Sequence, residues 1–212
     1  MCGDRYLAIE TSSPRLSLAI GDDQKVIASY SGARGWRHAE SVVVRMQALL
    51  RRARWTVQSL TGVAVSTGPG SFTGIRIGLA VARALGQALR IPVVGVSSLE
   101  VMAAGAKSTA KWLVPQIDAL GGQVFFGLFE RNGNRVLRRA MKETMVRGDG
   151  LSEKLKSRMG RQGVWISPLQ GCYPDARVLL EISRTKLAKA GPTSYRSVLP
   201  LYIRRSTAEE RR

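Results

Sequence analysis

A strand–turn–strand–turn–strand pattern occurs twice in the chain, and this repeat restricts the fold more than any other feature of the sequence. The first copy is RYLAIETSSPRLSLAIGDDQKVIASY, in which alternating apolar residues are interrupted by the turns TSSPR and GDDQ. The second copy, WLVPQIDALGGQVFFGLFERNGNRVLR, turns at GG and NGN and places Asp118 roughly where Glu10 stands in the first. Two antiparallel meanders within 212 residues predict two related half-domains that pack together.

Segments of helical periodicity separate the meanders and indicate an α/β protein. Helices are predicted in HAESVVVRMQALLRRA and FTGIRIGLAVARALGQALR, each followed by a short buried strand, around Val63–Val65 and in IPVVGVSS. A further helix, LEVMAAGAK, completes an N-terminal half-domain that we expect to span 1–107. Residues 108–212 form a shortened C-terminal half-domain, in which 141–190 mixes basic helical segments with one strand, GVWISP. The tail, 198–212, is a candidate to pack on the first half.

The composition is that of a globular protein, with 44% hydrophobic and 23% charged residues. No run of about 18 apolar residues appears, so no membrane span is expected. The first residues, MCGDRYLAIETSS, lack the basic-then-apolar order of a secretory signal. Cys2 and Cys172 are too few for a disulfide framework. We therefore expect a cytoplasmic protein with free thiols and no contact with a membrane.

The net charge of +18 is distributed unevenly. Residues 1–130 carry 14 Lys and Arg against 8 Asp and Glu, whereas residues 131–212 carry 19 against 7. The difference gives +6 for the first part and +12 for the second. Such a basic segment favours a polyanion or an acidic partner, or it is a solvated face in an arginine-rich protein. Both interpretations stay open, because aromatic residues do not alternate with the charges as stacking platforms would.

The glycine-rich stretch STGPGSFTG resembles a phosphate-binding loop in front of a helix, but its spacing fits neither common nucleotide motif. A Walker loop needs lysine after its last glycine, and here Gly74 is followed by Ile75 and Arg76. A dinucleotide fingerprint needs G-x-G-x-x-G, and Gly68, Gly70 and Gly74 are one residue too far apart. Anion binding at the helix N-terminus stays open. The candidate loop residues for an anion or nucleotide are Ser66, Gly68, Gly70, Ser71 and Thr73.

The helix after this loop has small residues at four-residue steps, namely Gly74, Gly78, Ala82 and Gly86. Glycine inside a helix costs about 0.5–1 kcal/mol relative to alanine, and close approach of another backbone could offset that cost. The stripe therefore predicts a tight helix–helix contact, either within the chain or with another chain, and the helix around Val42–Leu50 could share the same surface. The predicted partner-interface residues are Val42, Val43, Met46, Leu50, Gly74, Ile75, Gly78, Leu79, Ala82, Leu85 and Gly86.

Residues suited to catalysis or metal binding are scarce. His38 is the only histidine, so no two-histidine metal site can form, and no G-x-S-x-G motif is present. Glu10 and Asp118 could form a carboxylate pair that holds a metal, or each could cap its own turn. We expect neither a catalytic group nor a metal site.

One long motif, STGPGSFTGIRIGLAVARALG, closely resembles the signature of the TsaB (YeaZ) family, the bacterial subunit needed to make threonylcarbamoyladenosine in tRNA. Four further segments match that family in the same order and extend the resemblance over most of the chain, with 141–190 the weakest part. They are LAIETSSPRLSLAI, RHAESVVVRMQALL, PQIDALGGQVFFGLFE and LPLYIRR.

The resemblance implies an actin/Hsp70/sugar-kinase-like (ASKHA) fold of two half-domains, and a non-catalytic role. Family members bind a paralogue, TsaD, which transfers the threonylcarbamoyl group to the adenosine next to the anticodon, and an ATPase, TsaE, joins them. Helices at about 38–53 and 73–90 would form a four-helix interface with TsaD, and a related surface would allow a homodimer. The chain alone would bind no cofactor, because partners hold most of the ATP that the complex uses, and tRNA would be reached through the complex.

Two departures from the family pattern weaken a nucleotide or anion role. Glu10 stands where the family usually has aspartate, and Leu120 stands where arginine is common. The alternatives are a small ASKHA-type ATP-dependent kinase, an M22-like peptidase and a basic RNA-binding module. The sequence lacks the second-half phosphate and adenosine loops that a kinase of this type would need, and it lacks the metal site of the peptidase. The RNA-binding module is supported by charge alone.

Overall fold

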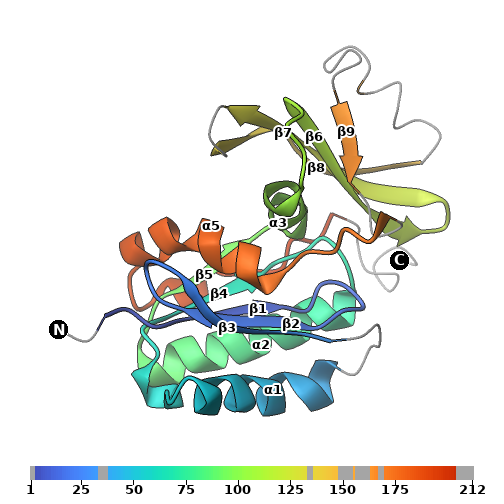
Figure 1. Cartoon of the computed structure of the whole chain (residues 1–212). Helices are drawn as coiled ribbons and strands as arrows, with labels where there is room; N and C mark the ends of the chain where they lie inside the picture. The colour runs from blue at the N-terminus through green and yellow to red at the C-terminus, as the bar shows by residue number, and fades with distance from the viewer. Residues whose placement is uncertain are drawn as a thin grey trace.

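The computed structural model describes residues 3–32, 38–132, 136–147, 155, 163–166 and 170–203, which form two β-sheets with helices around them (Figure 1). The first sheet has the strand order β3-β2-β1-β4-β5. Its strands are β1 (Tyr6–Glu10), β2 (Ser17–Gly21), β3 (Val26–Ser31), β4 (Gly62–Ser66) and β5 (Val93–Val96). The meander β1–β3 is antiparallel, whereas β4 and β5 run parallel to β1 and therefore need helical crossovers.

Alternate residues of the first sheet belong to two different cores, as the period of two in a strand requires. Leu7 and Ile9 point to the side covered by helices α1 (His38–Arg52) and α2 (Phe72–Leu89). Tyr6 and Ala8 point to the opposite side, where helix α5 (Ala176–Lys189) packs. The first sheet is therefore buried on both faces.

The second sheet has the order β8-β7-β6-β9 and repeats the antiparallel meander. Its strands are β6 (Trp112–Leu120), β7 (Gln123–Asn132), β8 (Val136–Arg147) and β9 (Gly163–Ile166). Helix α3 (Ser98–Gly105) connects the two sheets and contacts both α5 and the second meander. Leu99 and Met102 of α3 share a core with Leu113 and Phe129. Two meanders in a mixed α/β chain confirm the predicted fold class.

The C-terminal part of the chain returns to the first sheet. Ala176 N–H donates to the hydroxyl of Ser17, which attaches the start of α5 to β2. Val198 is buried in the core under α1 and α2, and Leu201 N–H donates to the carbonyl of Thr67. The described part of the tail thus contacts the first half, while the boundary near residue 107 stays a prediction.

One segment differs from its expected structure. Strand β8 continues to Arg147, although helical segments were predicted from residue 141 onward. Its pairing with β7 shifts register near Leu128, and these bulges break the alternation that marks a strand in the sequence. No helix in the described ranges is both long and apolar enough to cross a bilayer.

Candidate partner-binding surface

Helix α2 begins and ends at well-defined caps. The Ser71 hydroxyl accepts from Gly74 N–H at 3.1 Å, and Ser71 N–H donates to the Ser12 carbonyl at 2.7 Å. At the other end Arg90 adopts a left-handed conformation with φ of 55°, and its N–H donates to Gly86. The turn after β1 therefore holds the first residues of α2 in place.

The small-residue stripe of α2 faces the chain's own sheet and turn. A Cβ on Gly74 would overlap the Thr11 carbonyl oxygen, and a Cβ on Gly78 would overlap the Thr11 hydroxyl. A Cβ on Gly86 would likewise overlap the side chain of Val93, and Ala82 is 0% exposed. The prediction that Gly74, Gly78, Ala82 and Gly86 contact a partner is wrong, because the close approach that these residues permit is internal.

The larger predicted interface residues are mostly buried as well. Val42, Met46 and Leu50 of α1 and Ile75 and Leu79 of α2 lie in the core between the two helices and the sheet. Their assignment to a partner surface is therefore also wrong. Leu85 is half-buried against this core, and Val43 is the one predicted interface residue that is substantially exposed.

The outward face of α1 and α2 presents other small and apolar side chains. Val43 is 42% exposed and Val44 is 58% exposed, and Ala48 follows Val44 one turn later. On α2 the exposed alanines are Ala80, Ala84 and Ala88. The two helices contact each other on the side of the first sheet that lies opposite α5 (Figure 1). We call this surface, made of Val43, Val44, Ala48, Ala80, Ala84 and Ala88, the α1/α2 face.

The glycine loop in front of α2 is packed from within. Ser66 is fully buried with its hydroxyl 3.0 Å from that of Ser98, and a Cβ on Gly70 would overlap the Ser12 carbonyl. Gly68 has φ of 98°, which favours glycine, and lies against Ile75 and the tail. Ser71 is engaged as the helix cap, which leaves Thr73 as the exposed member of the set. Anion binding at this loop stays a prediction.

Glu10 and Asp118 each bond within their own turn, as expected for turn caps. Glu10 is fully buried and accepts from Ser12 N–H at 2.7 Å, whereas Asp118 is exposed and accepts from Leu120 N–H at 2.8 Å. Burial raises the pKa of Glu10, and hydrogen bonds from Ser12 and Ser66 oppose that rise only in part. The described residues contain no group of three or more His, Cys, Asp or Glu that could hold a metal ion.

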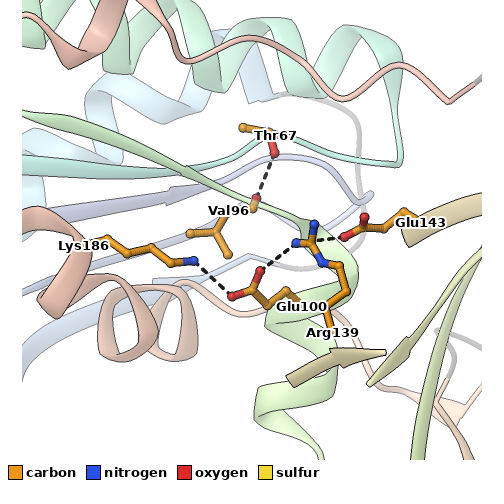
Figure 2. Close-up of polar contacts among 6 residues, drawn as sticks. All are labelled: Thr67, Val96, Glu100, Arg139, Glu143 and Lys186. Carbon is orange, nitrogen blue, oxygen red and sulfur yellow. Dashed lines mark hydrogen bonds and ion pairs between the residues drawn. The ribbon is translucent and has the colours of Figure 1, made fainter. Parts of the chain in front are cut away.

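A cluster of charged residues joins the two halves (Figure 2). Glu100 of α3 lies 3.1 Å from Lys186 of α5 and 3.0 Å from Arg139 of β8, and Arg139 also contacts Glu143 at 3.2 Å. These contacts connect α5 on the first sheet with the edge strand of the second. These ion pairs are suited to holding the two halves together rather than to catalysis, because each charged group already has a partner.

An open cavity of about 430 Å³ lies beside the edge strand β5. Polar groups along its wall are already engaged: the Thr67 hydroxyl donates to the Val96 carbonyl, and Lys186 pairs with Glu100 (Figure 2). The Ser197 hydroxyl donates to the Ser194 carbonyl. The Ser194 hydroxyl accepts from Val93 N–H at 2.8 Å. The cavity therefore offers few unsatisfied groups to a polar ligand.

Comparison with known proteins agrees with this architecture. A sequence profile of the family described as TsaD, tRNA N6-adenosine threonylcarbamoyltransferase, matches residues 32–160. The tRNA threonylcarbamoyladenosine biosynthesis protein TsaB of Buchnera aphidicola (subsp. Schizaphis graminum) is 34% identical over 72% of this chain and 73% of its own length. The protein of the same name from Escherichia coli is 26% identical over 96% of both chains.

A solved structure has the same fold over nearly the whole chain. YeaZ from Pseudomonas aeruginosa superposes with a TM-score of 0.78 and 25% sequence identity, covering 94% of this chain and 99% of that one. Sequence similarity and structural similarity thus extend over both sheets and the helices between them, and the chain belongs to the TsaB (YeaZ) family.

Proposed function

We propose that the chain is a non-catalytic subunit of the complex that makes threonylcarbamoyladenosine in tRNA, and that it binds and activates a TsaD paralogue through the α1/α2 face. The observation that carries this proposal is the exposure of Val43 and Val44 on α1 and of three alanines on α2, the helix that α1 contacts. Apolar and small side chains on two neighbouring helices allow another pair of helices to approach closely. The biosynthesis of threonylcarbamoyladenosine in tRNA is taken from the names of the relatives.

The accessory role is supported by the burial of Glu10, the acidic residue at the end of β1. Glu10 is fully buried and its Oε1 accepts hydrogen bonds from Ser12, so this carboxyl is not exposed to a metal–nucleotide complex. The chain then contributes surface rather than chemistry. TsaE and tRNA would be met through the assembled complex in the cytoplasm, with ATP held mainly by the partners.

The test is a binding and modification assay with the TsaD paralogue from the same genome. Val44→Asp and Ala84→Arg each place a charge on the α1/α2 face, and both should weaken binding to the paralogue by tenfold or more while circular dichroism stays unchanged. Leu120→Asp is the matched control, because Leu120 is 72% exposed on the second sheet. Unchanged affinity in both α1/α2 variants would contradict the assignment of the surface.

The non-catalytic assignment has a separate test. Threonylcarbamoyl transfer to tRNA should need the paralogue and should increase when this chain is added. Transfer by this chain without the paralogue would show that the chain is itself an enzyme, whatever its binding surface.

A further inference from the structure

Among the strands at the edges of the two sheets in the described ranges, β8 alone carries charged residues. The strand orders place β3, β5, β8 and β9 at the edges, and β3, β5 and β9 contain no charged residue. Strand β8 contains four cations, Arg138, Arg139, Lys142 and Arg147, and one carboxylate, Glu143. All four cations are exposed, whereas the side chain of Glu143 is only 3% exposed.

Protection of a sheet edge does not account for this concentration of charge. Charged side chains on an edge strand prevent pairing with another chain, and either sign of charge serves that purpose. The edge strand β3 has no charge and even leaves Ile27 40% exposed, so this protein does not protect its edges with charge as a rule. The positive sign of β8 therefore points to an anionic partner.

One end of β8 presents more positive charge than the adjacent carboxylate can neutralise. Glu130 of β7 contacts both Arg138 at 2.7 Å and Lys111 at 3.5 Å. The side chains of Arg138 and Lys111 are 69% and 55% exposed, whereas that of Glu130 is 12% exposed. The carboxylate thus orients two cations from below, and one positive charge remains at the surface.

The rest of the strand divides into one neutralised cation and two that have no ion pair. Arg139 lies between Glu100 and Glu143 and belongs to the contact between the two halves (Figure 2). None of the ion pairs in the described part of the chain involves Lys142 or Arg147. We call the surface made of Lys111, Arg138, Lys142 and Arg147 the β8 edge.

We infer that the β8 edge contacts the phosphate backbone of tRNA. This inference rests on the proposed function and adds a substrate-contacting surface to it. Arg138 and Arg147 are nine residues apart, so the edge extends over roughly 25–30 Å and can meet several successive phosphates of one RNA strand. Figure 1 shows β8 at the opposite end of the molecule from α1, so a paralogue on the α1/α2 face leaves the β8 edge open.

RNA fits this surface better than an acidic protein does. A stable protein interface has an apolar centre, and none of the exposed large apolar side chains among the described residues lies on β8. Base stacking is not expected either, because Trp112, 5.7 Å from Lys111, is packed against the core of the second sheet. Phosphate contacts position RNA without reading its sequence, so the β8 edge should bind any tRNA equally well.

The test measures how tightly an unmodified tRNA transcript binds the complex of this chain with the TsaD paralogue, at about 50 to 300 mM NaCl. Lys142→Ala/Arg147→Ala should weaken tRNA binding by about fivefold or more near 100 mM, while affinity for the paralogue and circular dichroism stay unchanged. The slope of log affinity against log salt should become less steep by about 2, because each phosphate contact contributes about 1.

The matched control removes two positive charges elsewhere on the surface. Lys25 before β3 and Lys189 at the end of α5 are exposed, and neither forms an ion pair among the described residues. Lys25→Ala/Lys189→Ala should change tRNA affinity by less than about twofold, because salt screens distant charges. An equal loss in both double variants would mean that net charge, and not the β8 edge, attracts the RNA.

A second pair of variants separates charge from shape. Lys142→Arg/Arg147→Lys keeps both charges and should bind tRNA within about twofold of wild type, whereas Lys142→Glu/Arg147→Glu should bind more weakly than the alanine variant. If the exchange of lysine and arginine cost as much affinity as alanine does, the contact would depend on side-chain shape and the phosphate assignment would be wrong.

The outcomes distinguish this inference from the proposed function. A paralogue complex whose tRNA affinity is unchanged by Lys142→Ala/Arg147→Ala leaves the proposed function standing and removes the inference. If wild type forms no paralogue complex, the proposed function fails, and binding of tRNA to the chain alone at about 50 mM NaCl decides on the β8 edge with the same variants. Loss of the paralogue complex in Lys142→Ala/Arg147→Ala, with unchanged tRNA binding by the chain alone, would assign the edge to a protein and overturn the inference.

Discussion

The hydroxyl of Thr11 occupies the position that a side chain on Gly78 would need. Thr11 lies just after β1 and Gly78 lies in the middle of α2, so this contact seats the helix on the sheet. The Thr11 hydroxyl is buried and has no hydrogen-bond partner among the described residues. Its place beside Gly78 is therefore a matter of packing, and it explains why α2 contains glycine there.

Substitution of this glycine should destabilise the fold. Gly78→Ala should lower the free energy of unfolding by about 1–3 kcal/mol, since an added methyl group forces a well-packed contact apart. The same change in a Thr11→Ala background should cost less, because the overlapping hydroxyl is gone. Urea unfolding of the four proteins measures the coupling.

The control for this experiment lies on the exposed side of the same helix. Ala84→Ser should change stability by less than about 0.5 kcal/mol. If Gly78→Ala lowered the free energy of unfolding equally in the wild-type and Thr11→Ala backgrounds, a contact other than the Thr11 hydroxyl would limit the space at Gly78.

Glu10 makes stability depend on pH. Burial raises its pKa in the folded protein, so between the ordinary glutamate value and the raised one the folded state holds a proton that the unfolded state has lost. Stability from this group is present at low pH and is lost as pH rises through that range. Glu10→Gln should therefore be more stable than wild type at pH 8, and the difference should shrink toward pH 4.5.

Urea titrations from pH 4.5 to 8 give the required comparison. Asp118→Asn, an exposed carboxyl in the corresponding turn of the second sheet, should follow the wild-type pH dependence. A Glu10→Gln protein less stable than wild type at pH 8 would mean that the carboxylate is charged and stabilising.

The positions of most elements could be predicted from the sequence, because each depends on local pattern. Alternation and glycine turns mark both meanders, and the spacing of apolar residues marks α1 and α2. The orientation of α2 could not be predicted in this way. Gly74 and Gly78 indicate a close neighbour, but that neighbour is Thr11, more than 60 residues earlier in the chain.

Two further features of the structure could be predicted from the sequence only in part. Helix α5 packs on the first sheet although it follows the second in sequence, so its location depends on a core formed by Tyr6 and Ala8. The α1/α2 face had a signal of its own, since Ala80, Ala84 and Ala88 also recur every four residues. Only the structure distinguishes this exposed series from the buried glycine series.

The ion pairs that Glu100 forms between the two halves should contribute little to stability. Glu100→Gln should lower the free energy of unfolding by about 0.5–1 kcal/mol, because its partners Lys186 and Arg139 are nearly half exposed and solvent screens the attraction. The difference should vanish near 1 M NaCl. Glu181→Gln, at an exposed position of α5 four residues after Arg177, is the matched control and should lower the free energy of unfolding by less than about 0.5 kcal/mol.

Tyr202 should hold the tail against the start of α2. Its ring stacks on Phe72, its hydroxyl accepts from Arg76, and the neighbouring Leu201 N–H donates to Thr67. Tyr202→Ala should speed hydrogen exchange of the Leu201 amide by about fivefold, since an aromatic pair contributes on the order of 1 kcal/mol. Tyr202→Phe keeps the aromatic stack but loses the hydroxyl, so its exchange rate at Leu201 should lie between those of wild type and Tyr202→Ala.

Leu199→Ala controls for the loss of exposed apolar surface in the same segment, because Leu199 is 61% exposed. Its effect on exchange at Leu201 should be less than twofold, since an exposed side chain loses little on truncation. If Tyr202→Ala and Leu199→Ala gave the same exchange rate, the hydrogen bond to Thr67 and the burial of Val198 would be sufficient to hold the tail. The aromatic stack would then be a consequence of the tail's position and not its cause.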